Sequence, residues 1–189
     1  MIRPLLASVA CLALLTACNS EQTPEAVDQA QDMAAAPVGQ VSAATMGSNM
    51  ESAYIPNAAM GDMYEIMAAD LALERSQNAR IKELARMIKT DHTAASTAMK
   101  AMLPQAAPGA TPPTELDERR QGLIDNLRSA SAANFDMVWI DQQIAAHQEA
   151  LTLHRGFSDN ESPLSAHARM VVPKIEAHLR MAEEIKAAM

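Results

Sequence analysis

From residue 54 onward, apolar residues recur at alternating spacings of three and four, the period of an α-helix with one buried face. The predicted long helices span residues 54–77, 79–103, 132–155 and 163–187, and a short helix spans residues 115–129. A segment rich in proline and glycine, residues 104–113, ends the second long helix. The buried stripe of the third long helix includes Met137, Ile140 and His147. The pattern predicts an all-α four-helix bundle with the short helix in the crossover between the second and third long helices.

Residues 19–53 lack any such period. This segment contains no lysine or arginine, carries five acidic residues, and is rich in alanine, serine, glutamine and proline. A chain of this composition buries too little apolar surface to offset the entropy of ordering it. We therefore expect residues 18–53 to form a disordered linker that tethers a folded domain spanning residues 54–189.

The first residues resemble a bacterial export signal. A basic start at Arg3 is followed by an apolar stretch from Leu5 to Leu15, which is too short to span a bilayer as a stable helix. The sequence Leu15-Thr16-Ala17-Cys18 is similar to a lipobox, in which small residues precede a cysteine that receives lipid. We expect a signal peptide at residues 1–17 and lipid attachment at Cys18; an ordinary secretory signal or an uncleaved anchor is the alternative. Asn19 favours sorting to the outer membrane of the bacterial cell envelope, with the domain in the periplasm.

Composition narrows the candidate chemistry. Aromatic residues make up 3% of the chain and glycines number six, which disfavours a β-sandwich or barrel. The formal net charge of −8 argues against a nucleic-acid partner, because duplex binding depends on lysine and arginine. Cys11 would leave with the signal peptide and Cys18 would carry lipid. We therefore expect neither a cysteine nucleophile nor a cysteine-ligated metal.

Each predicted long helix places one titratable residue on its apolar stripe near mid-length: Glu65, His92, His147 and His178. Such groups are costly to bury without partners, and bundles build metal sites from side chains that converge from facing helices. Glu65 and His92 lie almost equally far from the turn that joins the first two long helices, so we expect them at the same height along the bundle. The predicted ends of the last two helices leave His147 and His178 about 10 Å out of register.

Structural histidines are the alternative. A core histidine is usually satisfied by a carboxylate or a carbonyl, and Glu65 could serve His92 in this way. Asp62 lies on the same stripe, either as a second carboxylate for the site or as an exposed acid of the first turn. Asp91 and Glu149 are expected on solvated faces or near helix ends. His154 and His167, near the helix ends, are expected to be surface or structural residues.

The types of ligand in the predicted site limit which metals could bind there. Dinuclear carboxylate centres use Glu-x-x-His motifs, but Lys89, Ile144 and Ile175 stand three residues before the three histidines. Three imidazoles and one carboxylate suit a mononuclear site for iron, manganese, zinc or copper. The 14 methionines favour Cu(I), yet methionine at helical spacing is more often core filler, so copper ranks below an unspecified transition metal.

From Tyr54 to about Lys186 the chain resembles the bacterial family called domain of unknown function 4142, which is placed in the ferritin-like superfamily. The matching segments are Tyr54–Gly61 with Glu65, Leu71–Leu73, Met87–His92, Phe135-Asp136, His147, Val172-Pro173 and His178-Leu179. Ala146 stands where the family often has aspartate. The resemblance implies a ferritin-like bundle, often exported and described as an outer-membrane protein, and it supplies no activity.

The leading hypothesis is an outer-membrane lipoprotein that binds a transition metal in its bundle core and acts in metal buffering or envelope stress rather than as an enzyme. One alternative is a non-catalytic interaction module of the envelope whose core histidines are structural. A weaker alternative is a redox enzyme that uses a bound metal.

Overall fold

The structure is a computed structural model that describes residues 50–189. Its helices are α2 (Glu51–Arg75), α3 (Ala79–Ala106), α4 (Glu118–Ser129), α5 (Phe135–Ser158) and α6 (Ser165–Ala187). All five correspond to predicted helices, and the part of the chain that is described contains no strand. The predicted all-α fold is therefore confirmed. The expected signal peptide, the lipid attachment at Cys18 and the linker up to residue 49 lie outside the described residues.

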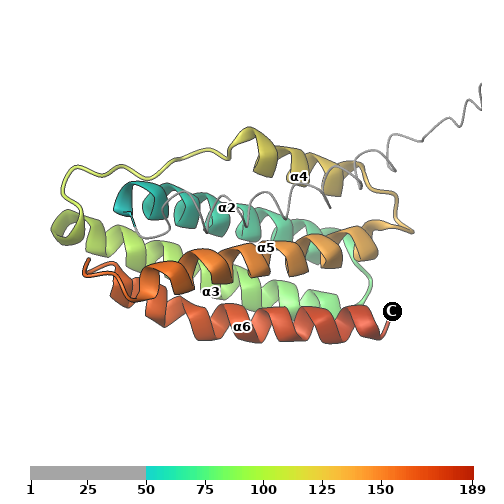
Figure 1. The fold of residues 1–189 in the computed structure, drawn as a ribbon. Coiled ribbons are helices and arrows are strands. Elements are labelled where there is room, and N and C mark those ends of the chain that lie inside the picture. Colours follow the sequence, from blue (N-terminus) through green and yellow to red (C-terminus); the bar gives the residue numbers. More distant parts are fainter. Residues whose placement is uncertain (1–49) are drawn as a thin grey trace, which may run out of the picture.

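The four long helices run side by side as a bundle (Figure 1). Helix α2 packs against α3 and α5, and α6 packs against the same two helices, so the four helices form a closed ring. The crossover from α3 to α5 contains α4, which packs on α2 and α5. Within residues 50–189, no helix combines the length and the apolar character that crossing a bilayer requires.

Two helix boundaries differ from the predicted ones in a way that matters for the site. Helix α5 continues to Ser158, and α6 begins only at Ser165, because the side chain of Ser162 accepts from the Leu164 amide and holds a turn there. His147 therefore lies 11 residues before the end of α5, and His178 lies 13 residues after the start of α6. A difference of two residues is about 3 Å along a helix, so the two histidines are nearly level. The register mismatch expected from the sequence is absent.

The first long helix also begins earlier than predicted. Helix α2 begins at Glu51, three residues inside the segment expected to be linker. Ser162 donates a hydrogen bond to the Glu51 carboxylate, which ties the first turn of α2 to the α5–α6 connection. The next helix begins as the sequence indicates, with the Asn78 side chain accepting from the backbone amide of Arg80 at 2.9 Å.

Small residues on α2 allow α5 to approach closely. Ala68, Ala69 and Ala72 are fully buried, and the indole of Trp139 packs in the same core cluster. The Trp139 Nε1–H donates to the Ala68 carbonyl over 2.9 Å, so the one polar atom of this ring is satisfied. The small side chains on this face of α2 thus allow α5 to pack closely, and the Trp139 hydrogen bond fixes its position.

Met137 was placed on the buried stripe of the third long helix, and this prediction is wrong. Met137 is 41% exposed, whereas Val138, Trp139 and Ile140 are buried. At about 100° per residue, a position ten residues before His147 lies about 80° away from it around the helix axis. Ile140, seven residues before His147, stays within about 20° of it and faces the core.

Helix α4 is held in place by Arg75 at the end of α2. Its guanidinium donates to the carbonyls of Leu127, Arg128 and Ala130, which the end of α4 leaves without helical partners. The same guanidinium carbon lies 4.5 Å from the centre of the Phe135 ring. Helix α4 is therefore docked on the bundle by α2.

Candidate metal centre

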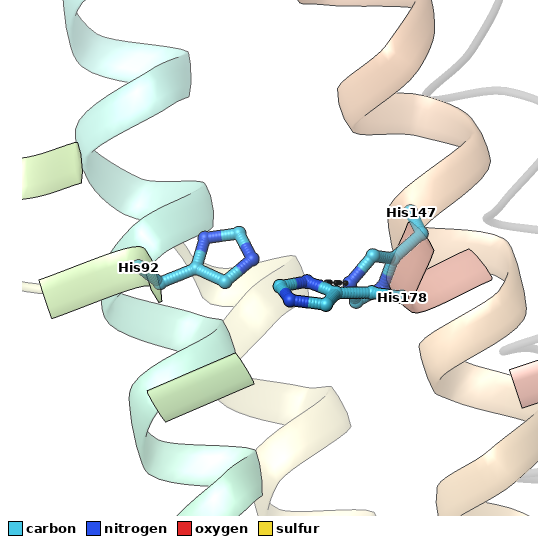
Figure 2. Close-up of side chains that lie close together, drawn as sticks. All are labelled: His92, His147 and His178. Carbon is cyan, nitrogen blue, oxygen red and sulfur yellow. Dashed lines mark hydrogen bonds between the residues drawn. The ribbon is translucent and has the colours of Figure 1, made fainter. Parts of the chain in front are cut away.

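Three imidazoles meet in the middle of the bundle. His92 comes from α3, His147 from α5 and His178 from α6, and their side chains point toward one another (Figure 2). One nitrogen of each ring lies within 4.8 Å of one nitrogen of each other ring. The three residues are 6%, 1% and 1% exposed. Three of the four residues predicted from the apolar stripes are thus brought together.

The orientation of His92 is set by Asp62 on α2. The Nδ1 atom of His92 lies 2.8 Å from the Asp62 carboxylate, so Nδ1 carries hydrogen and donates. Its other ring nitrogen, Nε2, is buried and has no hydrogen-bond partner. A histidine that donates from one nitrogen to a carboxylate and offers the other is the usual arrangement of a metal ligand.

The other two rings are fixed in the same manner. His147 Nδ1 lies 2.8 Å from the backbone carbonyl of Gln143, and His178 Nε2 lies 3.0 Å from the Asp91 carboxylate. A carbonyl and a carboxylate only accept, so these two nitrogens donate. The remaining nitrogens, His147 Nε2 and His178 Nδ1, face each other at 3.3 Å. In neutral rings both of these nitrogens carry lone pairs.

Burial keeps these two rings neutral. It lowers the pKa of His147 well below the usual value, and the neighbouring charges of His92 and His178 lower it further. Burial also lowers the pKa of His178, to about 4, again with help from His92. Two neutral imidazoles that face each other through lone pairs repel unless a proton or a metal cation lies between them. The geometry therefore favours a cation at this point.

The pKa of His92 is raised rather than lowered. Burial alone would lower its pKa, but the hydrogen bond to Asp62 and the negative charges of Asp62 and Glu65 outweigh burial and raise it. In the absence of metal, the proton on His92 supplies the positive charge that the cluster and its carboxylates favour. A metal ion at this site would replace that proton.

The distance between two of the ring nitrogens matches the edge of a tetrahedral site. Ligand nitrogens at about 2.0–2.1 Å from zinc, at tetrahedral angles, lie about 3.3–3.4 Å from each other. The 3.3 Å between His147 Nε2 and His178 Nδ1 matches this edge. The ring centre of His92 lies 5.8 Å from each of the other two ring centres, and one of its nitrogens lies within 4.8 Å of theirs. Three histidines at such a centre leave one coordination position open.

Glu65 lies beside this cluster rather than at its centre. Its Oε1 is 3.5 Å from Nδ1 of His147, the nitrogen that faces the Gln143 carbonyl, and its Oε2 is buried without a hydrogen-bond partner. Burial raises the pKa of Glu65 to about 7, although the positive charge of His92 acts in the opposite direction. The fourth residue predicted for the site thus contacts one ligand and keeps a free carboxylate oxygen.

The structure decides between the two roles expected for Asp62 and corrects the one expected for Asp91. The partner of His92 is Asp62, not Glu65, and Asp62 is buried rather than exposed in the first turn. Asp91 was assigned to a solvated face, yet it accepts from His178 and from Lys174. Burial alone would raise the pKa of Asp91, but these two hydrogen bonds outweigh it and hold the pKa below its usual value. Its position directly before His92 was the available signal.

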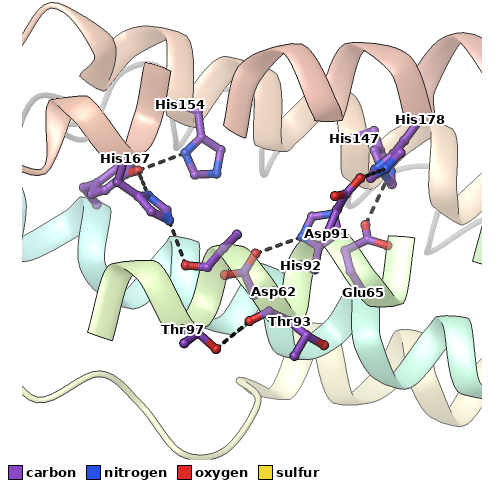
Figure 3. Close-up of polar contacts among 12 residues, drawn as sticks. Asp62, Glu65, Asp91, His92, Thr93, Thr97, His147, His154, His167 and His178 are labelled. Atoms are coloured by element: carbon purple, nitrogen blue, oxygen red, sulfur yellow. Dashed lines mark hydrogen bonds and ion pairs between the residues drawn. The ribbon is translucent and has the colours of Figure 1, made fainter. Parts of the chain in front are cut away.

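A second histidine pair lies farther along the bundle (Figure 3). His154 on α5 follows His147 by seven residues, about 10 Å along the helix. The Tyr54 hydroxyl lies 3.0 Å from His154 Nδ1 and 2.8 Å from His167 Nδ1, and His167 Nε2 donates to the Ala95 carbonyl at 3.0 Å. Both histidines are buried, and burial lowers the pKa of each. Of the two roles expected for these residues, surface or structural, their burial and this chain of hydrogen bonds fit the structural one.

Comparison with solved structures finds a similar bundle. The crystal structure of a DUF305 fragment from Deinococcus radiodurans aligns with a TM-score of 0.64 at 18% sequence identity, covering 72% of this chain and 94% of that one. At this identity the likeness concerns the fold alone, and it agrees with the predicted all-α bundle. Comparison with curated proteins finds no match. The family described as "Domain of unknown function (DUF4142)" matches residues 21–185, so the chain belongs to the DUF4142 family.

Proposed function

We propose that the bundle binds one transition-metal ion through His92 Nε2, His147 Nε2 and His178 Nδ1. The observation that carries this proposal is the pair of nitrogens of His147 and His178, 3.3 Å apart, whose opposite nitrogens both donate to oxygen acceptors. A purely structural histidine pair would share a proton between such nitrogens. Here each neutral ring has one N–H, and it donates that hydrogen to an oxygen outside the pair.

The donor set selects a class of ion. Three imidazole nitrogens suit zinc, copper, iron or manganese, and zinc and copper bind nitrogen donors most tightly among these. Glu65 lies next to the cluster and has a carboxylate oxygen without a hydrogen-bond partner, so we propose it as the fourth ligand. The complete set would then be Glu65, His92, His147 and His178, as the sequence predicted.

Burial supports metal buffering rather than catalysis. The three imidazoles are almost fully enclosed by the four long helices, so a substrate has little access to an ion at their centre. A site that holds and releases an ion needs only a route for the ion itself. We therefore assign the domain a role in metal storage or buffering, or in the response to metal stress.

The expected location fits this role. We propose that lipid on Cys18 anchors the protein to the outer membrane and that the acidic linker holds the domain in the periplasm. This part of the proposal rests on the sequence, and its test is direct. Cys18→Ser should block incorporation of radiolabelled palmitate and leave uncleaved precursor. Palmitate labelling that persists in the variant would contradict lipidation at this residue.

Metal content tests the proposed site. The domain, purified from the periplasm without chelators or affinity metals, should contain close to one equivalent of metal by mass spectrometry. A His92→Ala/His147→Ala/His178→Ala variant should lose it, while a matched His154→Ala/His167→Ala variant should keep it. If wild type stays empty after challenge with zinc, copper, iron and manganese, the histidines are structural and the interaction module becomes the better account.

A further inference from the structure

We propose that Asp91 and Lys174, here called the gate pair, form the gate through which metal enters and leaves the histidine cluster. This inference rests on the proposed metal site and adds its route of exchange. Asp91 on α3 accepts from His178 Nε2 with one oxygen and from the Lys174 ammonium with the other. The pair therefore joins a ligand of the buried site to the surface between α3 and α6 (Figure 3 shows the inner contact).

A gradient of burial identifies this side of the site. The Asp62 side chain, which supports His92, is 6% exposed, and the Gln143 residue, which supports His147, is fully buried. The Asp91 side chain is 25% exposed, and that of Lys174 is 43% exposed. Among the three groups that orient the imidazoles, Asp91 has by far the greatest access to solvent. An ion arriving from water meets this carboxylate before it meets any imidazole.

The charges of the pair suit a gate. The Asp91 carboxylate attracts a cation and, as an oxygen donor, can hold it briefly. The Lys174 ammonium occupies that carboxylate and repels a cation, so the arriving ion has to displace it. When Asp91 turns toward the ion, His178 loses its outer acceptor and its ring becomes free to reorient. Loss of the lysine charge should therefore speed both loading and release, whereas a positive charge elsewhere on α6 should matter little.

The rates of metal exchange test this inference. Full-length protein would be loaded with Co²⁺ or Cu²⁺ in stopped flow, following ligand-field absorbance, and unloaded into excess chelator. Lys174→Met should raise the second-order loading rate roughly tenfold at low salt, and the difference should shrink as salt screens the charge. The matched control is Lys186→Met, because Lys186 lies on the same helix, is 48% exposed and forms an ion pair with Asp141 at 2.6 Å.

The outcomes separate the two proposals. Wild type that binds neither ion removes the metal site and the gate with it. Wild type that binds one equivalent, together with equal loading rates for Lys174→Met, Lys186→Met and wild type, leaves the site intact and overturns the gate. Asp91→Asn adds a second measurement: a gate carboxylate predicts slower loading, whereas a residue that only orients His178 predicts an unchanged loading rate with faster release.

Discussion

The Nε2 atom of His147 and the Nδ1 atom of His178 lie 3.3 Å apart, and each ring donates from its other nitrogen to an oxygen acceptor. The outer acceptors thus fix the tautomers, and the tautomers aim two lone pairs at one point. His92, held by Asp62, adds a third nitrogen to the same cluster.

Asp62→Asn should weaken metal binding without removing it. The substitution keeps the size of the side chain but removes the negative charge that makes His92 a stronger base and holds its ring in place. Loss of such a supporting carboxylate typically costs about 10- to 100-fold in metal affinity. Competition titration against a chromophoric chelator would measure the change. Asp70→Asn is the matched control, because Asp70 lies on the same helix in an exposed ion pair with Lys89; an equal loss in both variants would refute the role of Asp62.

Metal affinity should rise with pH. His92 carries a raised pKa, and Glu65 has a pKa of about 7, so at neutral pH and below the metal-free site holds protons that an incoming ion displaces. His147 and His178 have lowered pKa values and compete little with metal at these pH values. Calorimetric titrations in two buffers of different ionisation enthalpy should show proton release on binding near pH 7. Binding with no proton release between pH 6 and 7 would show that His92 is neutral in the metal-free protein.

Glu65→Gln should stabilise the metal-free protein at alkaline pH. The pKa of Glu65 is raised from 4.5 to about 7, so the folded protein keeps this proton while the unfolded chain releases it, and stability falls as pH rises from about 4.5 to 7. At pH 8 the difference is about 3 kcal/mol, which corresponds to several degrees in melting temperature. Glutamine mimics the neutral acid and removes this loss. Thermal unfolding of both proteins should therefore give a higher melting temperature for the variant at pH 8 and little difference at pH 4; equal values at both pH values would contradict an ionised, buried Glu65.

Tyr54→Phe should destabilise the fold while leaving the metal site intact. The substitution removes the hydroxyl that pairs with His154 Nδ1 and His167 Nδ1, so two buried ring nitrogens lose their partner. Leaving buried polar atoms unsatisfied costs about 1–3 kcal/mol each. Urea denaturation would report this loss, and metal titration of the same variant should match wild type. Loss of metal together with unchanged stability would move the binding site to the second histidine pair.

The sequence predicted the bundle well because its apolar stripes are regular. The four residues predicted from those stripes are all buried, and three of them meet. The expected mismatch between His147 and His178 arose because both predicted helix ends were too early: α5 continues to Ser158 rather than residue 155, and α6 begins at Ser165 rather than residue 163, where Ser162 holds a turn. The height of a residue along the bundle depends on where its helix begins and ends, and the spacing of apolar residues does not show these ends.

The supporting acids were harder to assign. Asp62 and Glu65 lie about one turn apart on α2, and only side-chain packing decides which of them reaches His92. Asp91 follows the pattern of an exposed residue on α3, yet its carboxylate reaches across to α6. Cross-helix pairing of this kind depends on rotamers and interhelical distance, so it becomes visible only in three dimensions.

X-ray absorption at the edge of the bound metal tests the central claim most directly, because it counts the imidazole ligands on the ion itself. The purified, metal-loaded domain should show nitrogen or oxygen donors at about 2.0–2.1 Å with the multiple-scattering pattern of three imidazoles if zinc is bound. The His92→Ala variant should lose one imidazole from that pattern. A spectrum without imidazole scattering, or one that His92→Ala leaves unchanged, would contradict a metal centre built from His92, His147 and His178.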